Sequence, residues 1–299
     1  MLDRLNKALE HIEEDLGRPV DVAAMARTAL TSEHHLRRMF AALAGMPLSE
    51  YVRRRRLTLA GAEVMEGDRA LLDIAVDYGY SSAEAFNRAF RAVHGVSPGQ
   101  ARRTGAALVS QSRLAFHLTI EGNTRMRYRI LDKDAFGLVG LRKRIRNIAE
   151  GPNPDMIAFT ESVDDATWEL LEGISDQEPR GALSVPVARE AEDFGEEIDF
   201  YIAAATTAPA PRGMERLEVP ASTWVVFPFE RVEFPHGMQA LWRAVYSEWF
   251  PAHPAYRTAP GPALVAAEYD EHEPDIGSGQ MWLAVEKQGP DHVVSGARH

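Results

Sequence analysis

The chain has 299 residues, of which 45% are apolar and 26% charged, with a formal net charge of −11 and no cysteine. This composition is typical of a soluble globular protein of about two domains, and it excludes disulfides, thiolate zinc sites and cysteine nucleophiles. No stretch approaches the ~18 consecutive apolar residues of a membrane span, and the first residues lack the apolar core of a signal peptide. We therefore expect a cytoplasmic protein with no membrane contact.

The charge is divided unevenly along the chain. Residues 1–112 carry a formal net charge of +1, with arginine clusters at 53–56 and 102–103, whereas the remainder carries −12. An acidic region is unsuited to phosphate and attracts cations. Nucleic acid is therefore expected to bind the first part of the chain, and a cationic ligand the second.

The first hundred residues repeat themselves at an offset of about 50. The matching pairs are Ser32 and Ser82, Leu36 and Phe86, Arg38 and Arg88, Phe40 and Phe90, Gly45 and Gly95, and Pro47 and Pro98. Each copy predicts an apolar helix, a short turn, a serine-capped second helix and then a glycine and a proline. The residues between the copies, SEYVRRRRLTLAGAEVME, contain no proline and predict one long helix.

A helix, a short turn and a capped second helix form the helix-turn-helix pattern, whose second helix enters the major groove of DNA. In both copies the second helix combines an apolar stripe with a polar face that carries arginine at the same point. Two such units predict a monomer that reads two successive segments of the groove. A helical bundle whose polar faces are only solvated would have a similar pattern, so this alternative stays open here.

The stretches HLRRMF, PLSEYVRRRRL and DIAVDYGYSSAEAFNRAFRAVHGVSP resemble the AraC/XylS-type regulators, especially the Rob-like members, over about residues 2–104. The resemblance implies an all-α double helix-turn-helix domain that binds double-stranded DNA, and we also expect RNA polymerase as a partner. It places base-reading side chains at His34, Arg37, Arg38, Ala83, Glu84, Asn87 and Arg88. Arginine suits guanine, asparagine suits adenine and glutamate suits cytosine. An Arg38 that contacts phosphate instead would carry no sequence information.

The second half has a different pattern. Within a linker at 106–124, alternating apolar residues (Leu114, Phe116, Leu118 and Ile120) predict a strand or an extended clip against one domain. The residues beyond predict the order β-β-α-β-β-β-α-β-β, an α+β domain with an antiparallel sheet and two pseudo-repeated strand-helix-strand-strand units. The expected boundaries are 1–105 for the DNA-binding domain, 106–124 for the linker, 125–290 for the second domain and 291–299 for a flexible tail.

The stretches ERLEVPASTWVVFPFE, LWRAVYSEWFP, LVAAEYDE and QMWLAVEK resemble the gyrase-inhibitor-like effector-binding domains, over about residues 126–288. The resemblance implies a cleft between the pseudo-repeats that binds hydrophobic, often cationic, small molecules and has a buried acidic residue facing the ligand. The matching residue is Glu268, and the aromatic residues expected near it are Tyr201, Trp224, Trp242 and Tyr269. Aromatic residues most often pack in cores, and the face of Glu268 depends on strand register, so packing and solvent-exposed roles stay open.

No nucleophile elbow, phosphate loop or dinucleotide fingerprint appears, and the histidines are scattered. We therefore expect no catalytic residue, no cofactor and no metal site. The sequence predicts a sequence-specific transcription regulator whose DNA binding or activation is modulated by a small, hydrophobic and cationic ligand that binds in the second domain. Two alternatives stay open, namely that the second domain is a small-molecule hydrolase or that it binds no ligand and contacts a protein partner.

Overall fold

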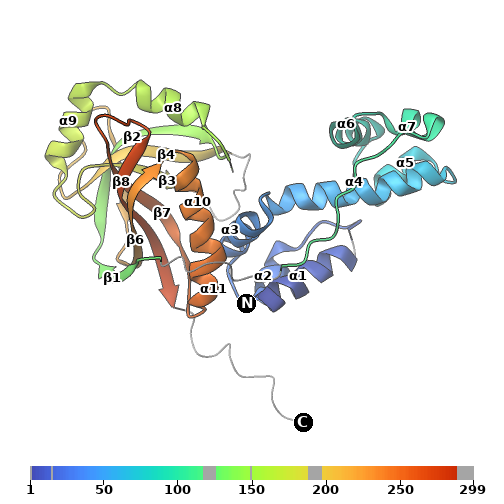
Figure 1. The fold of residues 1–299 in the computed structure, drawn as a ribbon, viewed down its shortest axis with the longest axis horizontal. Coiled ribbons are helices and arrows are strands. Elements are labelled where there is room, and N and C mark those ends of the chain that lie inside the picture. Colours follow the sequence, from blue (N-terminus) through green and yellow to red (C-terminus); the bar gives the residue numbers. More distant parts are fainter. Residues whose placement is uncertain (1, 15, 117–125, 149, 188–196, 288–299) are drawn as a thin grey trace, which may run out of the picture. The chain divides into compact units, whose positions relative to one another are not determined.

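The computed structural model describes residues 2–14, 16–116, 126–148, 150–187 and 197–287. We describe the chain in two parts, a helical part formed by the described residues up to 116 and a sheet part formed by the described residues from 126 to 287 (Figure 1). The predicted positions Leu118 and Ile120 of the linker and the predicted tail at 291–299 lie outside the described residues.

The helical part is all-α in its described residues, as predicted. Its helices are α1 Leu2–Glu14, α2 Val22–Ala29, α3 Glu33–Ala44, α4 Leu48–Glu66, α5 Leu71–Asp77, α6 Ala83–His94 and α7 Pro98–Thr104. The repeat is visible in the backbone, because α3 and α6 both have 12 residues and begin 50 positions apart. The long helix predicted between the copies is α4, with 19 residues.

Local chemistry explains where the second helix of each copy begins. The Oγ atoms of Ser32 and Ser82 accept hydrogen bonds from the amides of His35 (3.2 Å) and Ala85 (3.1 Å), which caps α3 and α6. The preceding turns pass through left-handed backbone, at Leu30 with φ 53° and at Gly79 with φ 81°. Only glycine adopts this conformation without strain, so the first copy carries a cost that the second avoids.

Apolar stripes hold the helices together. In α3 the residues Leu36, Met39 and Phe40 are buried. The second copy packs its helices around one cluster, formed by Leu57, Ala60, Val64, Ile74, Ala75, Phe86, Phe90 and Ala101. These residues recur at three- and four-residue spacing, which puts them on one face of each helix.

The sheet part is an eight-stranded sheet in which neighbouring strands are antiparallel, in the order β1-β6-β8-β7-β3-β4-β2-β5. The strands are β1 Arg129–Lys133, β2 Phe136–Arg146, β3 Ala182–Val187, β4 Glu197–Thr206, β5 Glu215–Val219, β6 Ser222–Glu233, β7 Tyr256–Tyr269 and β8 Ile276–Lys287. Its helices are α8 Pro154–Glu161, α9 Asp165–Ile174 and α10 His236–Ala244, which continues through a π-helical turn at Val245–Trp249 into α11 Phe250–Ala252.

The two pseudo-repeats form the two halves of this sheet. The first half is β2, α8 and α9, β3 and β4, and the second half is β6, α10, β7 and β8. The strand that precedes each half in the chain pairs with the other half, since β1 pairs with β6 and β5 pairs with β2. The halves meet where β3 pairs with β7, at only two register positions, Leu183 with Ala266 and Ser184 with Val265.

The predicted order lacks two elements, β3 and α8. Pro186 lies inside β3, and proline is a signal against a central strand. The strand tolerates it because β3 pairs with β7 only at Leu183 and Ser184, so no hydrogen bond to β7 is lost at Pro186. Helix α8 has only eight residues and is capped by Asn153, whose side chain accepts from the amides of Asp155 and Met156.

Helices cover one face of the sheet. Phe159 and Leu171 of α8 and α9 pack with Phe200 and Ile202 of β4, while residues of α10 to α11 pack with β6, β7 and β8. The other face packs against itself in a core that includes Phe136, Trp224 and Trp282. The space between the two groups of helices, above the β3–β7 contact, is where a cavity opens.

Candidate DNA-reading helices and ligand groove

Helix α6 presents a polar face opposite its buried stripe. Ala83, Glu84, Asn87 and Arg88 are all exposed, whereas Phe86 is buried on the other side. The predicted residues of the second recognition helix therefore share one accessible face. This arrangement is the one that a helix needs to place side chains against base edges.

Glu84 is held at the start of α6. Hydrogen bonds from its own backbone amide and from the Ser82 side chain lower the pKa of the Glu84 carboxyl, and the nearby Arg88 adds to this effect. The carboxylate is therefore ionised at neutral pH. An ionised carboxylate accepts hydrogen bonds but repels phosphate, so it suits a base edge with an amino group.

The predicted residues of the first recognition helix, His34, Arg37 and Arg38, occupy the positions in α3 that Glu84, Asn87 and Arg88 occupy in α6. They alternate with the buried residues of α3 in the same way as their counterparts in α6. The two recognition helices thus share a backbone plan but carry different side chains.

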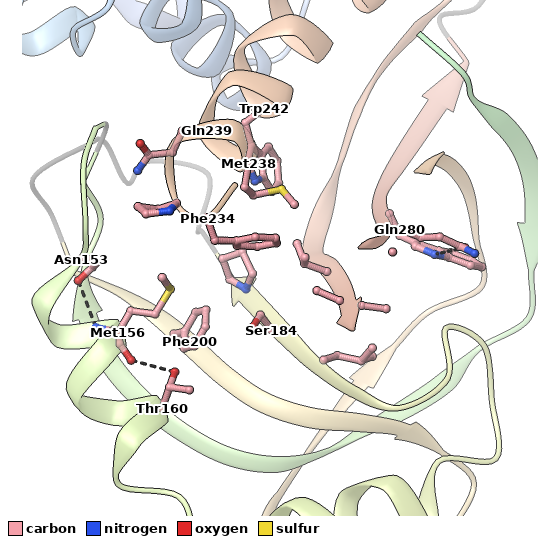
Figure 2. A pocket seen from close by; sticks show the side chains of 18 of the residues that line it. Asn153, Met156, Thr160, Ser184, Phe200, Phe234, Met238, Gln239, Trp242 and Gln280 are labelled. Carbon is pink, nitrogen blue, oxygen red and sulfur yellow. Dashed lines mark hydrogen bonds between the residues drawn. The ribbon is translucent and has the colours of Figure 1, made fainter. Parts of the chain in front are cut away.

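The sheet part contains a cavity between its two halves. Figure 2 shows Met156 of α8 and Met238 and Trp242 of α10 around the same space, with Phe200 of β4 and Ser184 of β3 between them. Phe234, Trp168 and Val265 also line it. These residues give the cavity an aromatic, thioether and aliphatic surface, as in most small-molecule sites, and charged and polar side chains make up the rest of the lining.

A pair of polar contacts ties the two halves together at this cavity. The side-chain amide of Gln239 in α10 accepts from the amide of Gly151 (3.0 Å) and donates to the carbonyl oxygen of Gly151 (2.8 Å). Beside them, Arg243 donates to Glu150 at 2.8 Å. Because the loop after β2 belongs to the first half and α10 to the second, these bonds restrain the width of the groove.

The cavity also reaches the end of β7 and the opposite face of the sheet. Glu268 and Tyr269 line it there and are exposed, and the Tyr269 ring lies 5.1 Å from the Phe234 ring. Strand alternation puts Glu268 on the same face as Gln280, whose Oε1 accepts from Trp282 Nε1 at 3.2 Å. Glu268 is therefore at the edge of the cavity in water, rather than buried.

Two of the predicted aromatic residues lie elsewhere. Tyr201 and Trp224 are buried in the core on the face opposite the helices, and neither lines the cavity. For Tyr201 the reason is strand alternation, because the neighbouring Phe200 faces the cavity and a shift of one residue reverses the face. We therefore assign Tyr201 and Trp224 to packing, while Trp242 and Tyr269 do line the cavity.

Several lining residues were missed by the sequence analysis, above all Met156, Phe234, Met238 and Gln239. Met238 is spaced four residues from Trp242 on one helix face, which was the available signal. Met156 and Phe234 belong to short or irregular segments without a periodic pattern.

Over the described ranges, no cluster of three or more potential metal ligands is found, and no helix has the length and apolarity needed to cross a membrane.

Comparison with known proteins agrees with both parts of the chain. Residues 25–104 match the family model of a helix-turn-helix domain, and residues 126–283 match that of the GyrI-like small molecule binding domain. The chain is 39% identical over 83 residues to the regulatory protein SoxS of Salmonella typhimurium strain LT2, which is 28% of this chain and 78% of that protein. It is 34% identical over 94 residues to the HTH-type transcriptional activator AarP of Providencia stuartii, which is 31% of this chain and 70% of that protein.

A solved structure, that of SAV2435 bound to tetraphenylphosphonium, is similar to 54% of this chain and 94% of that one, at 15% identity and a TM-score of 0.42. The chain belongs to the AraC-type DNA-binding transcription regulators and carries a GyrI-like small-molecule binding domain.

Proposed function

We propose that a small hydrophobic cation bound in the groove of the sheet part modulates DNA binding or transcription activation by this regulator. The observation that carries the proposal is the cavity between the two halves, lined by Phe200, Met238 and Trp242 and bordered by Glu268. A carboxylate at the edge of an aromatic cavity attracts a cation that also stacks on the rings.

Charges of both signs border the cavity. The acidic side chains include Glu172, Glu178 and Glu268, and the basic ones include Arg129, Arg180 and Arg243. The guanidinium of Arg129 lies 5.6 Å from the centre of the Trp282 ring and donates to Gln280 at 3.0 Å. The support for a cationic ligand is therefore the combination of Glu268 with the aromatic side chains, and not the sum of the charges.

For DNA we propose that α3 reads bases with His34, Arg37 and Arg38, and α6 with Ala83, Glu84, Asn87 and Arg88. The accessible face of α6 supports this assignment for the second helix. A ligand alters DNA affinity only if it prefers one arrangement of the two domains, so the two binding events must be linked. We further propose that the protein acts in the cytoplasm and contacts RNA polymerase at its promoter.

The test is a titration of the full-length protein with an aryl ammonium ion and with its neutral carbon isostere, followed by tryptophan fluorescence. Glu268→Gln should weaken cation binding by on the order of five- to ten-fold and leave the neutral isostere almost unaffected, because only the charge is removed. The matched control is Glu271→Gln, an exposed acidic residue in the turn that follows β7.

Equal loss for both ligands, or no loss, would remove Glu268 from the site.

The same titration is then repeated with a duplex containing the intergenic DNA upstream of the gene, at two salt concentrations, since phosphate contacts make the affinity salt-dependent. A shift of the DNA affinity on ligand addition supports the regulator. Turnover of the ligand would favour the hydrolase alternative, and an absence of saturable binding would favour a domain that only contacts a protein partner.

A further inference from the structure

The chain does not leave the helical part where α7 ends. Residues 108–116, which we call the strap, run back along α4 in an irregular but ordered path. Leu108 packs against the core of the second copy, the amide of Gln111 donates to Thr58 Oγ1 at 2.9 Å, and the amide of Leu114 donates to the Tyr51 hydroxyl at 3.1 Å. The strap is therefore antiparallel to α4.

Four backbone amides of the strap donate to side chains of the helical part. These bonds are Val109 N to His94 Nδ1 (3.2 Å), Gln111 N to Thr58 Oγ1 (2.9 Å), Leu114 N to Tyr51 Oη (3.1 Å) and Phe116 N to Asn6 Oδ1 (2.8 Å). Asn6 also donates from Nδ2 to the Phe116 carbonyl oxygen at 2.9 Å. The acceptors belong to α6 of the second copy, to α4 between the copies, and to α1, which packs against α2 of the first copy. The strap therefore joins the second copy to α4 and to the helix that supports the first copy.

The strap also lies over a buried ion pair. Arg55 is 9% exposed and Glu13 5%, and Arg55 Nη2 lies 2.7 Å from Glu13 Oε2. The Tyr51 hydroxyl donates to Glu13 Oε1 at 2.7 Å, and Arg55 Nη1 donates to the carbonyl oxygen of Gln111 in the strap at 2.7 Å. A detached strap would leave this guanidinium donor without its acceptor, which is costly in a buried site.

The sequence of α4 is adapted to the strap at one further position. Gly61 lies in the middle of this helix, where glycine is disfavoured by about 1 kcal/mol relative to alanine. A Cβ at this position would stand 3.0 Å from Leu108 Cδ1 and 3.5 Å from His94 Nε2. The absence of a side chain therefore allows the strap to approach the helix closely.

We propose that the strap positions the two helix-turn-helix copies for simultaneous contact with DNA, with Asn6, Thr58 and His94 as its positioning residues. Both recognition helices must fit the duplex at once, so a fixed relative orientation reduces the entropy lost on binding. The strap supplies such a restraint because its bonds reach from α6 across α4 to α1. At Phe116 the strap lies beside α1, through its two hydrogen bonds with Asn6.

The experiment uses the full-length protein and a duplex that this protein selects from a random-sequence pool. Amide hydrogen exchange is measured at Val109, Gln111, Leu114 and Phe116, and DNA affinity is measured in parallel. The variant is Thr58→Val, which keeps the shape of the side chain and removes the acceptor for Gln111. The matched control is Thr104→Val, because Thr104 Oγ1 donates only to the carbonyl oxygen of Gln100 in its own helix.

The expected result is slow exchange of the four amides in the unmodified protein. Thr58→Val should speed exchange of the strap and weaken DNA binding, each by about three- to ten-fold, as for the loss of one hydrogen bond, while Thr104→Val leaves both unchanged. Exchange of the four amides at the rate of an unstructured peptide would show that the strap is not hydrogen-bonded to the helical part, which contradicts the proposal. Faster exchange with unaltered DNA affinity would overturn its positioning role.

Asn6→Asp provides a second variant if Thr58→Val does not fold. It keeps an acceptor for the Phe116 amide and loses the donor to the Phe116 carbonyl oxygen, so it should give a smaller effect in the same direction. Neither measurement involves a small ligand, so the result does not depend on whether the groove binds a cation.

Discussion

The two helix-turn-helix copies share a backbone plan but differ in the polar contacts that support them. Beside the first copy, Glu13 and Arg55 form a buried pair, with side chains 5% and 9% exposed. Beside the second copy, Glu63 of α4 and Arg69 pair near the surface, with side chains 27% and 42% exposed. The repeat therefore preserves the apolar stripe and the helix cap, which determine the fold, while the polar support has diverged.

Substitution of Glu13 should have the largest effect and tests this difference directly. Glu13→Gln leaves the Arg55 guanidinium buried without its counter-charge, and breaking a buried pair in this way costs about 3–5 kcal/mol. The corresponding change in the second copy, Glu63→Gln, removes a surface ion pair and should cost about 0–1 kcal/mol. Urea unfolding of the full-length variants, followed by far-UV circular dichroism, measures both. Equal costs would show that the two copies are supported alike.

The Glu13–Arg55 pair also predicts how the stability difference between the unmodified protein and Glu13→Gln depends on pH. Burial alone raises the pKa of Glu13, but hydrogen bonds from Arg55 and Tyr51 and the charges of Arg55 and Arg113 outweigh it, so the pKa is lowered. A lowered pKa stabilises the fold above the pKa of the unfolded chain, and this contribution is lost as pH falls through the folded value. The stability difference between the unmodified protein and Glu13→Gln should therefore narrow in acid.

The features that could be predicted from the sequence are the local ones. The 3.6-residue periodicity and the serine caps predicted α3 and α6, and the absence of proline predicted α4, because these signals act within one helix. The strap was predicted only as a strand or an extended clip from the alternation of Leu114 and Phe116. Its actual bonds run from backbone amides to distant side chains such as Asn6, and such bonds have no periodic pattern in sequence.

The ligand groove was predicted less completely, for reasons that concern register and long-range pairing. Choosing Tyr201 instead of Phe200 was an error of one residue along β4, and one residue reverses the face of a strand. Strand β3 was not predicted because Pro186 disfavours a strand. The strand forms because β7 does not pair with β3 at Pro186. Trp242 lines the cavity together with Met238, which lies four residues before it on the same face of α10.

The next largest effect concerns the recognition helices and asks whether both copies read DNA. Arg38→Ala and Arg88→Ala should each weaken binding by about ten- to a hundred-fold if the residue contacts a base, because a lost base contact costs about 1–3 kcal/mol. Fluorescence anisotropy with the selected duplex measures this. Arg212→Ala, an exposed arginine of the sheet part, is the control for the loss of charge. If only one of the two variants binds more weakly, only that copy reads DNA, and unchanged affinity of both contradicts the proposed docking.

The smallest expected effect concerns the turns before α3 and α6. Each turn has a residue with left-handed backbone, which is Leu30 in the first copy and Gly79 in the second. Gly79 has φ 81°, and a Cβ there would meet Arg56 Nη1 and the Gly17 carbonyl oxygen at 3.6 Å, which is ordinary contact. Gly79→Ala should therefore cost about 1–2 kcal/mol, from the left-handed backbone alone. Leu30 already has φ 53°, so Leu30→Gly should relieve a similar strain and lose a half-buried side chain, for a net change within about 1 kcal/mol. Thermal unfolding of the two variants measures both changes. An unchanged stability of Gly79→Ala would show that this turn does not require glycine.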